Sequence, residues 1–152
     1  MKLLTLNTHS LIEPDYEAKR EIFVNFIAAE QPEVFALQEV NQTAAAPLLG
    51  EIPARYYPCS GNTVLLKADN HAAAVARMLE KQGVQYHWSW LPAKIGYDRY
   101  DEGAAVFSRA PITAAENLLL SKSDDYSCWK TRRTLGICAG DVWYYTVHLG
   151  WW

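Results

Sequence analysis

The sequence has no long apolar run, few cysteines and no surplus of positive charge. A membrane-spanning helix needs about 20 consecutive, mostly apolar residues, and no segment approaches that length. The amino terminus does not resemble a secretory signal peptide, because Lys2 is followed by only two leucines before polar residues begin. These absences predict a cytoplasmic protein without a membrane span.

Cysteine and charge exclude further classes of protein. Cys59, Cys128 and Cys138 are odd in number and widely spaced, so they form neither a disulfide framework nor a zinc-binding pattern, and reduced structural thiols are expected. The net charge of −3 argues against broad, sequence-independent binding of nucleic acid, which needs a basic face. The 152 residues, 50% hydrophobic and 20% charged, are typical of one globular domain.

The first part of the chain predicts a strand, a helix and a second strand. Residues 2–6 and 34–40 are short apolar runs, and Asp15 is the expected N-cap of a helix that ends near Glu30. Apolar side chains at helical spacing predict the helix face that lies on a sheet: Ile22, Phe23, Phe26 and Ile27. Strand, helix and strand at this spacing predict two adjacent parallel strands.

The remaining elements are one helix and several strands. The helix is predicted over residues 70–82, with Asn70 as its N-cap. Extended segments are expected at residues 84–90 and 103–108 and after Pro111 as far as Leu120. A hairpin is expected from residues 134–139 and 142–149, around Gly140 and Asp141. Together these elements predict a mixed α/β domain.

Two of the predicted strands end in polar side chains. The run at residues 2–6 is followed by Asn7, and the run that begins at Val34 delivers Glu39. If the two strands lie side by side, their oxygen atoms form half of a cation site of the kind that Mg²⁺ favours. The alternative is that Glu39 caps a strand or pairs with a surface lysine.

Glu102 and His148 are the next candidates. Glu102 lies in a segment rich in acids and tyrosine that could be only a solvated loop, followed by Gly103, which permits close approach of a ligand or of a neighbouring backbone. His148 lies in an apolar strand, where a lone histidine is commonly a core residue. Beside a bound phosphate, its imidazole could act as an acid or orient the phosphate.

A short basic segment, residues 130–133, comes before a predicted strand. Its ordinary interpretation is a solvated surface. Beside a metal held by carboxylates, however, the guanidinium of Arg132 or Arg133 would bind a phosphate through paired hydrogen bonds. His9 has no assigned role, because it is consistent with a simple loop residue.

Four segments, taken together, resemble the endonuclease/exonuclease/phosphatase superfamily: residues 6–10 (LNTHS), 37–41 (LQEVN), 100–109 (YDEGAAVFSR) and 147–152 (VHLGWW). They occur in the family's order and span the chain. The loop at residues 125–133 and the HLGWW ending are most similar to its bacterial metal-dependent hydrolase branch, near the sphingomyelinase-like members. The resemblance implies an α/β fold, a four-layered α/β/β/α sandwich with the site at one end of two facing sheets.

The resemblance also implies roles for residues. The cofactor would be Mg²⁺, with Mn²⁺ as the alternative. Glu39 would be the principal metal ligand, and Asn7 would support the metal or the phosphate. Glu102 would contact the active-site histidine, and His148 would be that histidine. Arg133 would contact the phosphate, with Arg132 as the second choice.

The sequence departs from the family at its carboxyl end. The family continues with a Gly-Asp-x-Asn motif and later a Ser-Asp-His motif, which position the phosphate and the attacking water. Here Gly140 and Asp141 are followed by Val142 and Trp143, so we interpret the pair as a turn. Residues 1–152 are therefore expected to be the amino-terminal part of such a domain, truncated at its carboxyl end.

The expected function is a Mg²⁺-dependent phosphoester hydrolase, a phosphodiesterase or phosphatase, in which water attacks in line and the general base lies outside these residues. Two alternatives are an incomplete, inactive fragment that associates through an uncovered sheet edge and a pseudoenzyme that binds phosphorylated ligands. The acidic balance and the short basic segment favour a small or lipid-derived phosphoester over long nucleic acid as substrate.

Overall fold

Seven strands and two helices form the part of the chain that the structure, a computed structural model, describes, residues 1–150. Trp151 and Trp152, the last letters of the HLGWW segment, lie outside it. The strands are β1 (Leu3–Asn7), β2 (Val34–Thr43), β3 (His87–Gly96), β4 (Tyr100–Ser108), β5 (Ile112–Leu119), β6 (Arg133–Ala139) and β7 (Val142–Thr146). The helices are α1 (Tyr16–Glu30), α2 (His71–Lys81) and the short 3-10 turn η1 (Ser10–Ile12).

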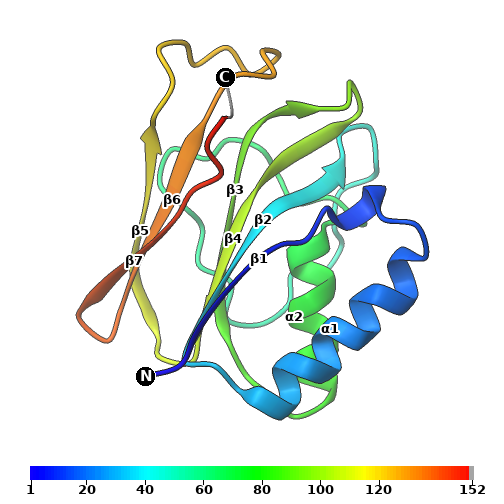
Figure 1. The fold of residues 1–152 in the computed structure, drawn as a ribbon, viewed down its shortest axis with the longest axis vertical. Coiled ribbons are helices and arrows are strands. Elements are labelled where there is room, and N and C mark those ends of the chain that lie inside the picture. Colours follow the sequence, from blue (N-terminus) through cyan, green and yellow to red (C-terminus); the bar gives the residue numbers. More distant parts are fainter. Residues whose placement is uncertain (151–152) are drawn as a thin grey trace.

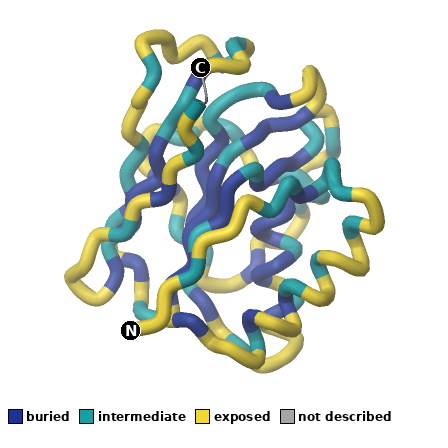
Figure 2. The backbone as a smooth tube through the Cα atoms, viewed as in Figure 1, coloured by how far each residue is buried: buried dark blue, intermediate teal, exposed yellow. Residues whose placement is uncertain are grey.

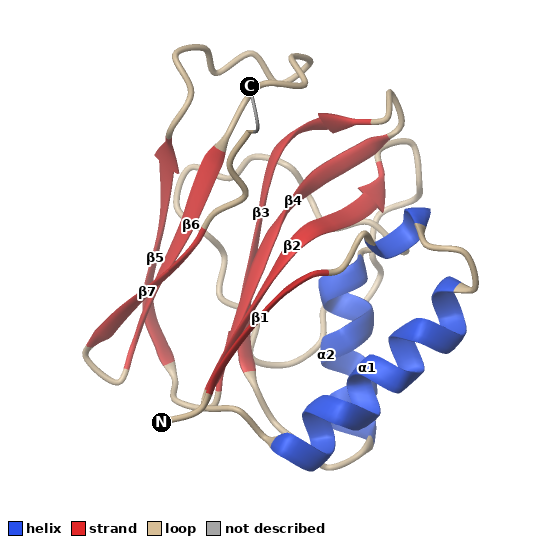
Figure 3. Ribbon diagram, viewed as in Figure 1, coloured by secondary structure: helices blue, strands red, loops and turns tan. Residues whose placement is uncertain are grey.

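The strands form two sheets that face each other (Figure 1). The larger sheet has the order β1-β2-β4-β3, and the smaller sheet has the order β5-β6-β7. Both helices cover the outer face of the larger sheet (Figure 3). Residues 1–150 thus contain three layers, helices, sheet and sheet, of the predicted four-layered sandwich. The fold class is confirmed, and the truncation of the domain at its carboxyl end stays a prediction.

The first strand–helix–strand unit is as predicted. β1 pairs with β2 in parallel, from Leu3 opposite Val34 to Asn7 opposite Gln38. All other pairs of strands are antiparallel. Because parallel neighbours end at the same edge of a sheet, the residues that follow β1 lie beside the second half of β2. This geometry creates the candidate site described below.

The predicted inner face of α1 is partly wrong. Val24 and Ile27 are fully buried and Phe23 packs beside them, whereas Ile22 is 70% exposed and Phe26 is 49% exposed. Four apolar residues in six positions cover more than one face of a helix, so spacing alone does not select the buried stripe. Asp15 occupies the predicted N-cap position, but its side chain makes no capping hydrogen bond and its φ is positive.

Two apolar clusters form the core. One lies between the helices and the larger sheet and contains the fully buried rings of Phe35, Trp88, Trp90 and Phe107. The other lies between the sheets and contains Leu91, Val106, Leu135 and Ile137. Buried backbone therefore follows the middle strands of both sheets (Figure 2).

The acidic segment before Gly103 is solvated only in part, at the exposed residues 97–99, which include Asp98. It forms the turn between β3 and β4 and the start of β4, where Asp101 and Glu102 are both buried. Asp101 accepts hydrogen bonds from Gln42 (2.9 Å) and from the Tyr126 hydroxyl (2.8 Å), so it joins β4 to β2 and to the loop after β5. A β-carbon at Gly103 would overlap the carbonyl of Leu91, which explains the glycine by close approach of the β3 backbone.

The hairpin β6–β7 has the predicted turn but a shorter second strand. Gly140 and Asp141 both have positive φ, 58° and 61°, as a two-residue turn of this kind requires. β7 ends at Thr146 rather than at residue 149. His148 therefore lies beyond the strand, with 41% of its side chain exposed, and is not a core residue.

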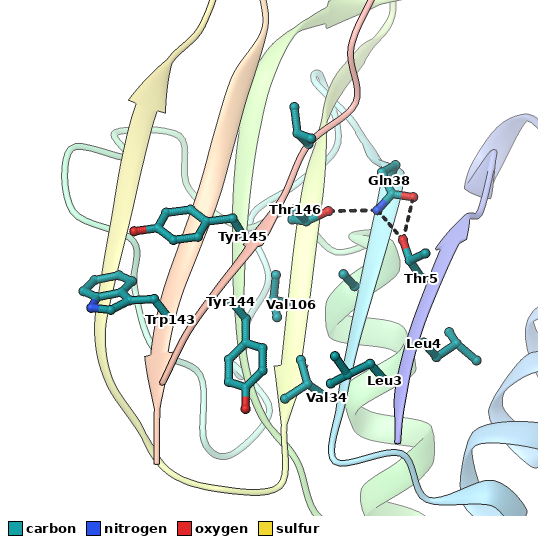
Figure 4. Close-up of a pocket in the computed structure, with 12 residues that line it drawn as sticks. Leu3, Leu4, Thr5, Val34, Gln38, Val106, Trp143, Tyr144, Tyr145 and Thr146 are labelled. Atoms are coloured by element: carbon teal, nitrogen blue, oxygen red, sulfur yellow. Dashed lines mark hydrogen bonds between the residues drawn. The ribbon is translucent and has the colours of Figure 1, made fainter. Parts of the chain in front are cut away.

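One side of the sandwich is open between the two sheets. β1 and β7 are edge strands, and a cleft of about 500 Å³ separates β7 from the β1–β2 pair (Figure 4). Its walls carry Leu3, Val34 and Val106 from the larger sheet and Trp143 and Tyr144 from the smaller one.

Within residues 1–150, neither helix has the length and apolar character needed to cross a bilayer.

The start of α2 gives a prediction about acid stability. His71 is buried, with its Nδ1 2.8 Å from the Tyr16 hydroxyl, and burial lowers its pKa from 6.5 to about 3. Below about pH 6.5 the imidazole of His71 binds a proton in the unfolded chain but not in the folded chain. The contribution of His71 to the free energy of unfolding therefore has its full value above that pH and declines as the pH falls toward 3.

We expect the wild-type protein to lose about 2 kcal/mol between pH 6.5 and 5 through this histidine, measured by urea unfolding. His71→Gln should show a correspondingly flatter pH profile, and His87→Gln, which changes a less buried histidine whose pKa burial also lowers, should flatten the profile less. An unchanged slope in His71→Gln would contradict the assignment.

Candidate functional site

Glu39 lies at a β-bulge. Gln38 pairs with Ala104 and Val40 pairs with Gly103, so Glu39 has no partner on β4 and its φ is 52°. β2 continues beyond it to Thr43, and the prediction that the carboxylate lies at a strand end is wrong in this respect. A bulge redirects one side chain without ending the strand, which explains how Glu39 reaches the edge of the site.

The loop after β1 holds the bulge in place. The hydroxyl of Ser10 donates to the Glu39 carbonyl (2.7 Å) and accepts from the backbone N–H of Asn41 (3.0 Å). Ser10 is buried, so these bonds are shielded from water. The positive φ of Glu39 is thereby stabilised by a residue of η1.

Asn7 and Glu39 converge as predicted. The Nδ2 of Asn7 donates to Oε1 of Glu39 at 3.0 Å. Oδ1 of Asn7 accepts the backbone N–H of His9 at 3.0 Å, and this bond determines the orientation of the amide. Asn7 therefore fixes the position of the Glu39 carboxylate.

The second carboxylate oxygen of Glu39 lacks a hydrogen bond. Oε2 is buried and has no hydrogen-bond partner among residues 1–150, although the side chain as a whole is 15% exposed. A buried carboxylate oxygen without a partner is costly, and it marks a position for a cation or a ligand donor.

This donor set fits an open cation site. No group of three or more His, Cys, Asp or Glu side chains in residues 1–150 is arranged as a metal cage. Mg²⁺ does not need one, because it is commonly held by one or two carboxylates together with water and substrate phosphate. Glu39 fits that role, and a closed structural zinc site does not fit.

Two histidines flank the carboxylate. Nε2 of His148 lies 3.7 Å from Oε1 of Glu39, and Nε2 of His9 lies 4.0 Å from Oε2. Tyr97, at the turn between β3 and β4, places its hydroxyl 3.4 Å from the same nitrogen of His9. His9, which sequence reasoning left without a role, is therefore part of the site.

Glu102 lies in a recess next to this carboxylate. It forms an ion pair with Lys94 (2.6 Å), and both side chains are largely buried, 8% and 12% exposed. The recess is also lined by Arg132, Arg133 and His148. Glu102 and His148 both line this recess, but the ion-pair partner of Glu102 is Lys94, and the contact with the histidine stays a prediction. Gly96 permits this arrangement, because a β-carbon there would overlap the Glu102 carboxylate.

The two arginines point in different directions. Arg133 donates through Nη1 to Asn117 of β5 at 3.0 Å. Arg132 donates through Nη1 to the carbonyls of Trp129 and Thr131. Burial lowers the pKa of the Arg132 guanidinium, while the charges of Glu102 and Glu39 act to raise it. Arg132 is therefore within electrostatic range of both carboxylates. Both arginines line the recess, and the choice of Arg133 over Arg132 as the phosphate contact stays a prediction.

A buried amide joins the three strands that lead to the site. Nε2 of Gln38 donates to the Thr146 hydroxyl at 2.8 Å and lies 3.1 Å from the Thr5 hydroxyl (Figure 4). Thr5 lies two residues before Asn7, and Thr146 lies two residues before His148. Sequence reasoning missed this contact, since only the facing of the two sheets brings residues 38 and 146 together. Lys94 was missed for another reason, because its contact with Glu102 depends on the register of β3 against β4 in one sheet. For Ser10 the available signal was a polar residue three positions after β1.

Comparison with known proteins identifies relatives of the same fold. The sequence profile described as "Endonuclease/Exonuclease/phosphatase family" matches residues 4–151. A structure of an endonuclease/exonuclease/phosphatase family protein from Leptotrichia buccalis C-1013-b is 26% identical, with a TM-score of 0.84 over 99% of this chain and 54% of that one. Among curated protein sequences there is no match.

More distant structures share the fold alone. An endonuclease/exonuclease/phosphatase from Beutenbergia cavernae DSM 12333 is 20% identical, with a TM-score of 0.65 over 98% of this chain and 38% of that one. A 3'-5' exonuclease from Neisseria meningitidis is 18% identical, with a TM-score of 0.52 over 97% and 41%. The chain thus spans about half the length of these relatives or less.

Proposed function

The chain belongs to the Endonuclease/Exonuclease/phosphatase family, and we propose that it forms the metal- and phosphate-binding part of a phosphoester hydrolase. The observation that carries this proposal is the Glu39 carboxylate. Asn7 holds one of its oxygens, and the other is buried without a hydrogen bond among residues 1–150. Such an arrangement is prepared for a divalent cation, Mg²⁺ or Mn²⁺.

Each polar side chain has a task in this proposal. Glu39 holds the cation, and Asn7 keeps the carboxylate in place. A bound divalent cation would neutralise charge on the phosphate oxygens, which makes the phosphorus atom more open to attack by water in line with the leaving group. Arg132 contacts a non-bridging oxygen. The Glu102–Lys94 ion pair, which is neutral overall, forms part of the wall of the recess.

His148 acts on the leaving group. Its exposed imidazole lies next to the Glu39 carboxylate, so a phosphate at the metal lies within reach of it. We propose that His148 donates a proton to the leaving oxygen or orients the phosphate. We assign no general base among residues 1–150, and the positioning of the attacking water belongs to other groups.

The proposed substrate is a small or lipid-derived phosphoester. The chain has a net charge of −3, and its basic residues at the site form one short segment, so a long polyanion finds no extended basic face. A panel of phosphomonoesters, phosphodiesters, lipid headgroup esters and oligonucleotides, assayed with Mg²⁺ or with EDTA, tests function and substrate class together. Hydrolysis that EDTA does not affect would overturn the proposal. So would a protein that contains these residues and hydrolyses none of the substrates.

The arginine assignment makes a separate prediction. Arg132→Ala should weaken binding of inorganic phosphate by roughly 10- to 100-fold, because a charged hydrogen bond contributes about 1.5–3 kcal/mol. Arg133→Ala is the matched control and should change the Kd by less than about 3-fold, since its guanidinium bonds Asn117. Isothermal titration in the presence of Mg²⁺ measures both. A larger loss of phosphate affinity in Arg133→Ala than in Arg132→Ala would instead assign the phosphate contact to Arg133.

The open face favours a second property, association with additional polypeptide. β1 and β7 leave two strand edges beside one apolar cleft, and Trp143 and Tyr145 are stacked and partly exposed on β7. We propose that polypeptide of the same domain covers this face, because the Leptotrichia buccalis protein is nearly twice as long as the matched region. Slow amide exchange in β1 and β7 of a longer protein would support this occupant. Self-association of the 152-residue chain through these edges would instead assign the face to a second copy.

A further inference from the structure

His9 lies at the site but has no role in the proposed function. It directly follows Thr8 in the loop that carries Asn7, and its own backbone N–H bonds the Asn7 amide. Its φ is 50°, a left-handed conformation that is uncommon for a residue other than glycine. The loop therefore holds the imidazole in a defined position next to Glu39.

A carboxylate determines which ring nitrogen of His9 carries the proton. Nδ1 lies 3.1 Å from Oε1 of Glu13, and Glu13 is in turn paired with Lys19, whose hydrogen bond lowers the pKa of that carboxyl group. An ionised carboxylate only accepts hydrogen bonds, so Nδ1 of the neutral imidazole is the donor. Nε2 then has a lone pair, and it points toward the groups around Glu39 and Tyr97.

The gap between Nε2 of His9 and Oε2 of Glu39 has the width of a metal bridge. The two atoms are 4.0 Å apart, too far for a hydrogen bond, and Oε2 has no hydrogen-bond partner in residues 1–150. Metal–nitrogen and metal–oxygen bonds of first-row divalent ions are about 2.0–2.2 Å, so one ion between the atoms can reach both. Histidine ligands commonly donate their other N–H to a carboxylate, as His9 does to Glu13.

We propose that His9 is a metal ligand that shares one divalent cation with Glu39. This inference rests on the proposed function, and it specifies the cofactor more narrowly. An imidazole nitrogen suits transition-metal ions better than Mg²⁺, which prefers oxygen ligands. The site is therefore expected to bind Mn²⁺ or Co²⁺ more tightly than Mg²⁺, with Glu13 as the positioning residue for the His9 ring.

Binding of Mn²⁺ alone, followed by electron paramagnetic resonance, tests this inference without an activity assay. Pulsed spectra of the Mn²⁺-loaded chain should show coupling to an imidazole ¹⁴N. The coupling should disappear in His9→Gln and persist in His148→Gln, although His148 also lies near the carboxylate. His87→Gln, outside the site, controls for substitution of any histidine.

Affinities provide the second readout. His9→Gln should weaken the binding of Mn²⁺ by about 10-fold or more and leave the Kd for Mg²⁺ nearly unchanged. Glu13→Gln should weaken the binding of Mn²⁺ by roughly 10-fold. Persistence of the ¹⁴N coupling in His9→Gln, or its absence in the Mn²⁺-loaded wild-type chain, would overturn this inference while leaving the Glu39 metal site standing. Mn²⁺ binding that is insensitive to Glu39→Gln would overturn both the inference and the metal site.

Discussion

Replacing Glu39 with glutamine is expected to lower metal-dependent phosphodiester hydrolysis by about 1,000-fold or more, which corresponds to roughly 4 kcal/mol of transition-state stabilisation. The substitution removes the negative charge and exchanges the Oε2 ligand for an N–H₂ group that cannot bind a cation. The remaining amide oxygen can still accept the hydrogen bond from Asn7, so the bulge and the loop around it should keep their structure. The measurement is kcat/KM on a generic phosphodiester, in a protein that contains these residues and is active.

Glu51→Gln is the matched control, because Glu51 is an exposed glutamate that is not one of the site residues. It removes the same charge and should leave activity at the wild-type level. Circular dichroism and urea unfolding of Glu39→Gln show whether the loss arises from chemistry or from folding. Full activity in Glu39→Gln would remove the basis of the metal assignment.

Replacing Trp90 with alanine should produce the largest loss of stability. Trp90 is fully buried between the larger sheet and the helices, and its indole N–H donates to the carbonyl of Val40 at 3.1 Å. Removing the ring costs about 3–5 kcal/mol, and loss of the hydrogen bond adds roughly 1 kcal/mol. Since a domain of this size is stable by about 5–15 kcal/mol, a large part of the margin disappears.

Trp90→Phe separates the two contributions. It keeps most of the apolar volume and deletes the N–H donor, so it should cost only about 1–2 kcal/mol in urea unfolding. Val40 directly follows Glu39, and both variants should therefore also weaken Mn²⁺ binding, Trp90→Ala more strongly. A change in unfolding free energy below about 1 kcal/mol in Trp90→Ala would contradict this view of the core.

The part of the site made by neighbouring strands was predictable. A strand, a helix and a second strand specify adjacent parallel strands, and the polar residues after the first and within the second must then meet, as Asn7 and Glu39 do. The bulge at Glu39 was not predictable, because its sequence, LQEVN, carries no glycine or other marker of the positive φ.

Contacts between distant segments were beyond sequence reasoning for a physical reason. Whether Glu102 meets His148 or Lys94 depends on the register of β3 against β4, which shifts near Pro92. Neighbouring residues at a strand point to opposite faces, so choosing between Arg132 and Arg133 requires knowing which face is turned to the site. The exposed side chains of Ile22 and Phe26 show the same ambiguity for α1.

The buried amide of Gln38 has a consequence for the geometry of the candidate site. It connects the larger sheet to Thr146 of the smaller one, two residues before the His148 imidazole. Any event that slides one sheet over the other, including assembly along the free edges of β1 and β7, must stretch or break this connection. The distance between the Glu39 carboxylate and the His148 imidazole would change with it, so this hydrogen bond couples the packing of the two sheets to the geometry of the candidate site.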